Sequence, residues 1–164
     1  MKIRKNFQTA ALLTTILTAG GIFNMTDAHA EEFKTIFPTG AKNDAYAQYF
    51  VGQSYLNMLS LEQVVIGNVT FEPGCRNNWH IHHADKGGGQ ILLVTGGRGY
   101  YQEWGKEPQE LHPGDVVNIP AGVKHWHGAA PTSWFAHLAI EVPGENTKNE
   151  WCEPVDADAY NKLK

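Results

Sequence analysis

Five histidines of this chain occur at spacings that suit a shared metal ion. His80 and His82 stand two positions apart in "NNWHIHH". His125 and His127 repeat this spacing in "KHWH", and His137 lies within the apolar run "WFAHLAIE". Residues i and i+2 of a β-strand point to the same face, so the two members of each pair project together. Isolated histidines are more often loop residues or single buried groups, but two such pairs on separate strands favour a common site.

The chemistry of imidazole explains why these spacings matter. Neutral imidazole is a good ligand for divalent first-row metals, and two rings on one strand face converge on one ion without distorting the backbone. A third ring from another strand completes a facial set. A fourth, harder oxygen donor would favour Mn, Fe or Ni in a six-coordinate site with open positions over a closed tetrahedral zinc site.

A secretory leader is predicted before these strands. The chain begins "MKIRKNFQTAALLTTILTAGGIFNMTDAHAEEF", in which three basic residues are followed by an apolar, uncharged stretch and an A-x-A sequence that ends at Ala30. This layout predicts a signal peptide over residues 1–30, cleaved after Ala30. The alternative is an uncleaved membrane anchor. It is disfavoured because the apolar stretch is interrupted and shorter than the roughly 20 residues that span a bilayer.

Cleavage would leave residues 31–164, enough for one domain with a single core. The full chain has a net charge of −4, and removal of three basic residues and Asp27 makes it −6. The sequence contains no basic patch, and no later segment is apolar for long enough to span a bilayer. We therefore expect a soluble protein, exported to the periplasm or secreted, that binds neither nucleic acid nor membranes.

The rest of the chain has the pattern of short strands separated by turns. Strand-like runs recur at intervals of about 8–15 residues with glycine or proline between them, which is typical of an all-β sandwich or barrel. The aromatic segment "AYAQYFVGQSYL" (residues 45–56) is expected to be one of these strands. A helix is expected only near the end, where Asp156 could cap "ADAYNKLK".

Two features stay open at the level of the sequence. Cys75 and Cys152 could form a disulfide in an oxidising compartment, but two cysteines this far apart are also what chance supplies. The triple glycine Gly87–Gly89 could be a mobile lid, or it could supply positive φ in a turn before the next strand.

Two sequence motifs resemble those of the cupin superfamily. "GCRNNWHIHHADKGGGQILLVTG" (residues 74–96) resembles the first cupin motif, and "GDVVNIPAGVKHWHGA" (residues 114–129) resembles the second. The resemblance implies an all-β, single-domain cupin, a jelly-roll barrel or double-stranded β-helix, with its core at about residues 45–142. The chain departs from the pattern at Gln90, where cupins usually carry glutamate, and in the longer segment between His82 and Gln90. Ala129 also replaces the final asparagine of the second motif.

Within this superfamily the chain is similar to the small bacterial manganese cupins that include hydroxynitrile lyases. That resemblance implies a divalent metal, manganese in the first place, with Fe, Ni or Zn as alternatives. It implies four ligands: His80, His82, Gln90 and His125. As a neutral ligand, Gln90 would add no negative charge, so the metal would stay a stronger Lewis acid than with glutamate. Gln90 could instead be only the polar first residue of the strand "QILLV", which would leave three histidine ligands.

The function that this resemblance implies is a metal-dependent lyase. It would cleave a carbon–carbon bond in a small hydroxylated substrate, with the metal as Lewis acid and His127 as general base. His137 would be a second polar group in the pocket. The alternatives are an oxygen-using cupin dioxygenase and a non-catalytic cupin that binds a small molecule. The resemblance also implies a homo-oligomer assembled through the N-terminal strands.

Overall fold

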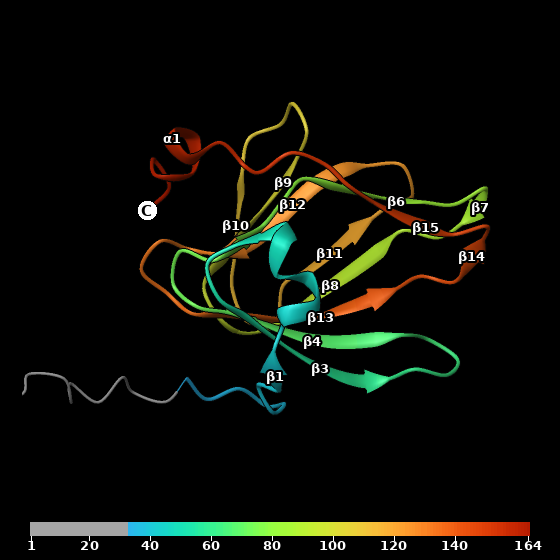
Figure 1. Cartoon of the computed structure of the whole chain (residues 1–164), viewed down its shortest axis with the longest axis horizontal. Helices are drawn as coiled ribbons and strands as arrows, with labels where there is room; N and C mark the ends of the chain where they lie inside the picture. The colour runs from blue at the N-terminus through green and yellow to red at the C-terminus, as the bar shows by residue number, and fades with distance from the viewer. Residues whose placement is uncertain (1–32) are drawn as a thin grey trace, which may run out of the picture. The chain divides into compact units, whose positions relative to one another are not determined.

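Two large antiparallel sheets and a separate two-stranded pair build residues 33–164, the part of the chain that the computed structural model describes (Figure 1). The first sheet contains, in spatial order, β1 (Ala41–Lys42), β3 (Ser54–Ser60), β4 (Ile66–Phe71), β13 (Phe135–Glu141), β8 (Gln90–Gly97) and β11 (Val116–Ile119). The second contains β10 (Gln109–Leu111), β9 (Gly99–Glu103), β12 (Lys124–Ala129), β5 (Arg76–Asn77) and β2 (Phe50–Val51). It also includes β6 (His80–His83), which pairs with β12, and β15 (Lys148–Trp151), which pairs with β6. The predicted leader, residues 1–30, lies outside the described residues.

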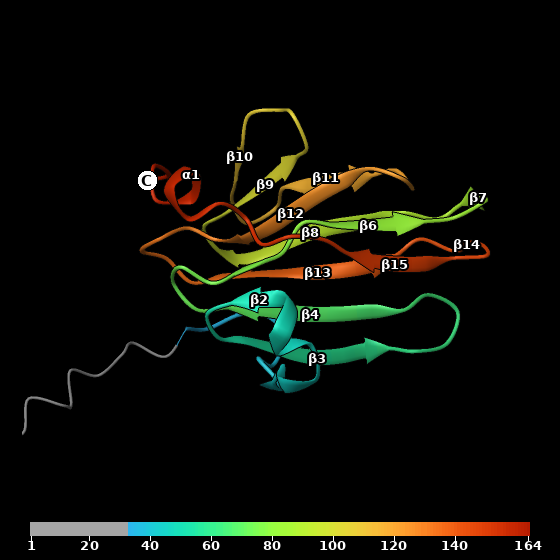
Figure 2. The same ribbon diagram turned by 45° about the horizontal axis from the view of Figure 1, so that its top comes forward.

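The period-2 alternation of the strands places one apolar face of each sheet against the other. In β8, Gln90, Leu92 and Val94 are buried, whereas Ile91 and Leu93 on the opposite face are more exposed. The inward side chains of both sheets form one core: Val69, Phe71, Cys75, Leu92, Val94, Tyr101, Leu111, Val117, Ile119, Ala129 and Phe135. The sequence prediction of an all-β fold is confirmed, and the arrangement is that of a jelly-roll barrel (Figure 2).

The C-terminal segment covers the outer face of the second sheet. Trp126 of β12 points away from the histidines on that strand, and its ring centroid lies 5.9 Å from that of Tyr160. Tyr160 ends α1 (Ala157–Tyr160), in which Oδ1 of Asp156 accepts a hydrogen bond from the N–H of Ala159 (2.8 Å). The predicted helix and its cap are therefore confirmed, but the helix is shorter than predicted.

The predicted strand over residues 45–56 is wrong in its first half. Asp44–Tyr49 form a 3-10 helix, η1, and β2 and β3 lie on either side of Gly52. Gly52 has a φ of +85°, and a Cβ there would lie 3.1 Å from the Cα of Cys75. Such a left-handed residue interrupts a strand. The bend divides the aromatic segment between the sheets, because β2 pairs with β5 and β3 pairs with β4.

Cys75 and Cys152 are both free thiols in the structure. Cys75 lies in the core between the sheets, where burial raises the pKa of its thiol to about 12. Cys152 is half-buried and packs against the second apolar cluster, which includes Trp126 and Tyr160. The disulfide that the sequence left open is not formed.

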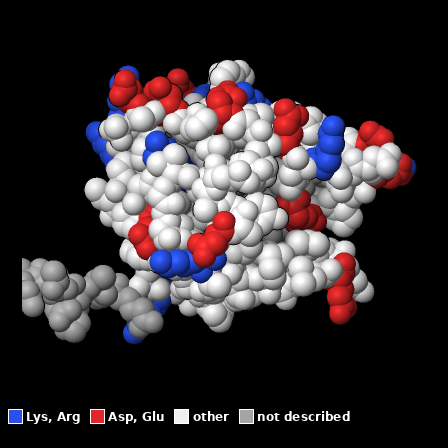
Figure 3. All heavy atoms as spheres, viewed as in Figure 1, with Lys and Arg blue, Asp and Glu red and all other residues white. Residues whose placement is uncertain are grey.

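The surface carries charges of both signs. On the face seen in Figure 3, acidic and basic side chains are interspersed with uncharged ones. Within residues 33–164, no helix is both long enough and apolar enough to cross a membrane. Export of the chain, and its lack of nucleic-acid and membrane partners, stay predictions.

The triple glycine forms a tight turn between β6 and β8. Its three residues have φ of +62°, +72° and +93°. The first of them belongs to β7 (Lys86–Gly87), which pairs with β14 (Gly144–Glu145) at one end of the barrel (Figure 1). A Cβ on Gly89 would overlap the carbonyl oxygen of Ile119 and lie 2.9 Å from the backbone nitrogen of Ala121. The backbone therefore requires glycine directly before Gln90, as the turn interpretation predicts.

Substitution of Gly89 tests this constraint on the strand that carries Gln90. Gly89→Ala should lower the free energy of unfolding by about 2 kcal/mol or more beyond Gly105→Ala, because the new methyl group meets backbone atoms. Gly105 is the matched control: its φ is +77°, but a Cβ there would have no neighbour within 4 Å. Gly105→Ala should lower the free energy of unfolding by only the roughly 1–2 kcal/mol that a non-glycine residue costs in the left-handed region. Denaturant unfolding measures both, and equal losses would contradict the proposed backbone contact.

Candidate metal centre

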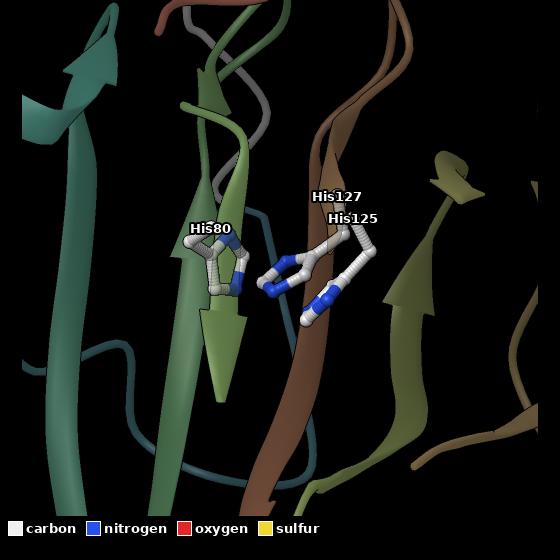
Figure 4. Close-up of side chains that lie close together, drawn as sticks. All are labelled: His80, His125 and His127. Atoms are coloured by element: carbon white, nitrogen blue, oxygen red, sulfur yellow. The ribbon is translucent and has the colours of Figure 1, made fainter. Parts of the chain in front are cut away.

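Two strands of the second sheet bring three imidazole rings together (Figure 4). His125 of β12 lies opposite His80 of β6 in the strand register, and His127 follows two positions later on the same strand. The candidate ligand nitrogens of His80, His125 and His127 all lie within 4.8 Å of one another. The three residues are buried, with exposed fractions of 2%, 0% and 4%. A cluster of this kind fits a divalent metal site.

Backbone hydrogen bonds orient two of these rings. Nδ1 of His80 lies 3.0 Å from the carbonyl oxygen of Asn78, and Nδ1 of His125 lies 2.9 Å from that of Val123. A carbonyl oxygen only accepts, so each ring carries its proton on Nδ1 and keeps the lone pair of Nε2 available. This is the tautomer in which metal-binding histidines are usually held.

A carboxylate orients the other predicted ligands. Glu141, the last residue of β13, has Oε2 3.0 Å from Nδ1 of His82. Its Oε1 accepts a hydrogen bond from Nε2 of Gln90 at 3.2 Å. The ring centroid of His82 lies 5.3 Å from that of His80 and 5.6 Å from that of His125. His82 and Gln90 therefore lie beside the three-histidine cluster, with Nε2 and Oε1 as their remaining acceptors.

Three of these acceptors have no hydrogen-bond partner among residues 33–164. They are Nε2 of His82, Nε2 of His125 and Oε1 of Gln90, all buried. Buried polar atoms are nearly always paired, so three orphaned acceptors in one place indicate a missing partner. Imidazole nitrogen and amide oxygen are both ligands for divalent metals, and the donor set therefore fits a metal.

His127 differs, because protein groups contact both of its ring nitrogens. Oδ1 of Asn77 accepts a hydrogen bond from the backbone N–H of His127 (2.9 Å), and the Asn77 amide nitrogen lies 3.0 Å from Nε2 of the ring. Nε2 of His137 lies 3.1 Å from Nδ1 of His127. Among residues 33–164, the cavity wall includes His127 but not His137, which is 0% exposed. The sequence placed His137 in the pocket, whereas the structure has it behind His127.

Burial keeps these rings neutral. It lowers the pKa of His80 and His127 well below the ordinary value, and repulsion from neighbouring histidines adds to the effect. Burial also lowers the pKa of His125 and of His137 to about 4. The neutral imidazole is the form that binds a metal or accepts a proton. All four rings are therefore in the state that either role requires.

A cavity of about 520 Å³, a volume that suits a small molecule, is lined by His80, His82 and His127. Three aromatic side chains form part of its wall: Tyr46, Phe50 and Trp151. The Trp151 ring on β15 has its centroid 4.9 Å from that of His80. Sequence reasoning ended the core at about residue 142 and missed β15, because nothing local indicates that this strand pairs with β6.

Sequence reasoning also missed Glu141 and Asn77. A signal for Glu141 was present, since it stands four positions after His137 in one strand and therefore shares its face. Asn77 carried no such signal, because it lies on the separate strand β5. His83, the remaining histidine of "HIHH", points away from the cluster and has Nε2 2.7 Å from a carboxylate oxygen of Glu150.

Comparison with known proteins places the chain in a family. A sequence profile of the cupin domain matches residues 67–138. The (R)-mandelonitrile lyase of Granulicella tundricola is 46% identical over 95 residues, which are 58% of this chain and 70% of that protein. A cupin-like protein of known structure from Thermotoga maritima is 37% identical, with a TM-score of 0.69, and the match covers 80% of this chain and 98% of that one.

The chain belongs to the cupin family. Its three-histidine cluster fits a divalent metal site in a cupin. Family membership does not by itself fix an activity. An 11S globulin seed storage protein of Helianthus annuus is also similar, at 25% identity over 126 residues; these are 74% of this cupin but only 24% of the storage protein.

Metal analysis tests the centre directly. The full chain purified without added metal should contain stoichiometric divalent metal, and His125→Ala should lose it. Because a metal at 100 times its Kd stabilises the folded state by about 2.7 kcal/mol, added Mn²⁺ should raise the Tm of the stripped protein. The matched control is His83→Ala, which removes the outward ring and should keep both metal and Tm shift. Equal metal contents in the two variants would contradict the assignment.

Proposed function

We propose that this cupin is an exported, metal-dependent lyase that cleaves a carbon–carbon bond in a small hydroxylated substrate, of the hydroxynitrile-lyase type. The observation that carries the proposal is the place of His127, a neutral buried imidazole in the cavity wall beside three orphaned metal-ligand atoms. The 46% identity to a mandelonitrile lyase supports the reaction class.

The proposed ligands are His80, His82, Gln90 and His125. His80, His125 and His127 form the tightest histidine set, so His127 is the competing candidate. Two contacts argue against it as a ligand: Asn77 and His137 already engage its ring nitrogens. The acceptors of His82 and Gln90, by contrast, have no protein partner. The resemblance to the small manganese cupins supports manganese as the ion, and Fe, Ni or Zn, which imidazole ligands also suit, are the alternatives.

The bound ion would supply Lewis-acid polarisation of the substrate oxygen. His127 would act as the general base and remove the proton from the substrate hydroxyl. The electron pair of that O–H bond forms the aldehyde carbonyl, and the pair of the broken carbon–carbon bond leaves with cyanide. The imidazolium of His127 then returns the proton to cyanide, so an aldehyde and hydrogen cyanide leave and the ring is neutral again.

Two residues would support His127 in this role. Asn77 holds both the backbone and the ring of His127, and its amide nitrogen can only donate, which favours a lone pair on Nε2. The substrate hydroxyl would take the place of this amide at Nε2 when the substrate binds. His137 faces the other ring nitrogen and can share the positive charge when the ring is protonated. His137 would therefore act through His127 without contacting the substrate.

Export and oligomer formation belong to the same proposal. The basic, apolar and A-x-A sequence of residues 1–30 supports export with cleavage after Ala30. Exposed apolar side chains support a homo-oligomer assembled through the N-terminal strands: Val51 of β2 and Met58 of β3 are each 40% exposed.

The role of His127 can be separated from that of a ligand by two measurements on one variant. In the manganese-loaded protein, His127→Ala should lower the rate of aldehyde release from mandelonitrile by about 10²–10⁴-fold, the usual contribution of a general base. The same variant should retain the metal content of the wild type. Loss of the metal would instead make His127 a ligand, and unchanged turnover would remove it from the mechanism. His112→Ala, at an exposed turn position, is the control.

The oxygen dependence of turnover distinguishes the lyase from a dioxygenase. Cleavage of a hydroxynitrile needs no oxidant, so aldehyde release should be equal under argon and under air. The manganese- and iron-loaded forms should both be assayed with an oxygen electrode. Turnover that stops under argon, with matching oxygen uptake, would overturn the lyase proposal.

A further inference from the structure

The carboxylate of Glu141 bridges two of the proposed ligands. In the register of β13 and β8, Glu141 lies directly opposite Gln90. One of its oxygens accepts from Nε2 of Gln90 at 3.2 Å, and the other lies 3.0 Å from Nδ1 of His82. Both contacts are to the atoms that these ligands do not use for a metal. The two contacted residues come from strands of different sheets, β8 and β6.

The acceptor character of the carboxylate fixes the polarity of both neighbours. An ionised carboxylate has no proton to donate, so Gln90 must turn its NH2 group toward Glu141 and its Oε1 away from it. His82 must likewise carry its proton on Nδ1, which leaves the lone pair on Nε2. These are the same two atoms, Oε1 of Gln90 and Nε2 of His82, that lack a partner in the protein.

Glu141 also supplies a charge that the ligands do not. Three neutral imidazoles and an amide bring no negative charge to a divalent ion. Among the described residues that line the cavity, Glu141 is the only carboxylate. It is therefore the group placed to balance part of the charge of the ion, from one hydrogen bond behind the ligands.

We infer that Glu141 is a positioning residue of the metal centre. It holds Gln90 with its oxygen inward, fixes the tautomer of His82, and provides the negative charge that the neutral ligand set lacks. This inference rests on the ligand set given under the proposed function.

An isosteric substitution tests the polarity argument. Glu141→Gln keeps the size of the side chain, but its amide can accept from His82 only by turning its NH2 group toward the NH2 group of Gln90. Two donors then face each other. Gln90 relieves this conflict by turning over, which points its nitrogen at the metal. We expect the affinity for Mn²⁺ to fall by about 10–100-fold, the usual effect of losing such a supporting group.

A second substitution should restore the arrangement. In the double variant Gln90→Glu/Glu141→Gln, the carboxylate at position 90 can accept from the amide at position 141, which still accepts from His82. The polarity, the ligand oxygen and the net charge are then all recovered, so Mn²⁺ affinity should return to within about threefold of wild type or exceed it. Gln90→Glu alone places two carboxylates in contact and should bind more weakly than the double variant.

Glu150→Gln is the matched control. Glu150 also bonds a histidine of β6, but that residue is His83, which points away from the centre. Its contact distance of 2.7 Å is comparable with that at His82. This variant should bind Mn²⁺ as the wild type does.

Metal affinity of the full chain is measured by titrating the stripped protein with Mn²⁺ and following the free ion by electron paramagnetic resonance. Unfolding temperatures of the metal-free variants, expected to agree with wild type, confirm that folding is intact. If the wild type binds Mn²⁺ and Glu141→Gln binds it equally, the role of Glu141 is overturned and the proposed centre stands. If Glu141→Gln is weaker but the double variant is not restored, the polarity argument is wrong. If the wild type binds no divalent metal, both the centre and this inference fail.

Discussion

Burial in the interior of a small barrel favours the neutral form of four imidazole rings. A buried positive charge without a partner is too costly to keep, so burial lowers the pKa of His80, His125, His127 and His137. A neutral ring still has one N–H to satisfy. At His80 and His125 a backbone carbonyl accepts it. The other nitrogen of each ring is then left as a lone pair beside its neighbours, and the centre is arranged before any ion binds.

The register of the strands brings these neutral rings together at one site. His80 and His125 are direct partners in the pairing of β6 with β12. A shift of one residue would turn every side chain of β6 to the other face and bring His83 inward. On its other edge β6 pairs with β15, which brings Trp151 opposite His80. The short strand is therefore held between two others, and its register is fixed from both sides.

The sequence predicts those parts of the centre that depend on alternation within one strand. His80 and His82 share a face, and the burial of β6 alternates accordingly. His125 and His127 share a face too, although Trp126 between them is also buried, against Tyr160 on the opposite side. The contact of His127 with His137 could not be predicted, because it depends on the packing of β12 against β13. The bend at Gly52 could not be predicted either, so the sequence predicts one strand where the structure has two. Glycine permits a positive φ without requiring it, and at Gly52 the bend depends on the close approach of the backbone of Cys75, directly before β5.

Glu141 shows how a departure from the family pattern can be compensated from another strand. Where cupins usually carry glutamate, this chain has Gln90. Among the described residues of the cavity wall the one carboxylate is that of Glu141, which is hydrogen-bonded to Gln90 from behind. Coulomb attraction falls inversely with distance, so a charge moved back by one hydrogen bond still attracts the ion but less strongly than a ligating carboxylate would. With Glu141 in the proposed role, the ion would be a stronger Lewis acid than in a glutamate-ligated cupin. It would be a weaker Lewis acid than an ion held by the neutral ligand Gln90 without a carboxylate nearby. The same displacement leaves a neutral amide facing the ion, so the ligand oxygen does not compete with His127 for the proton of the substrate hydroxyl.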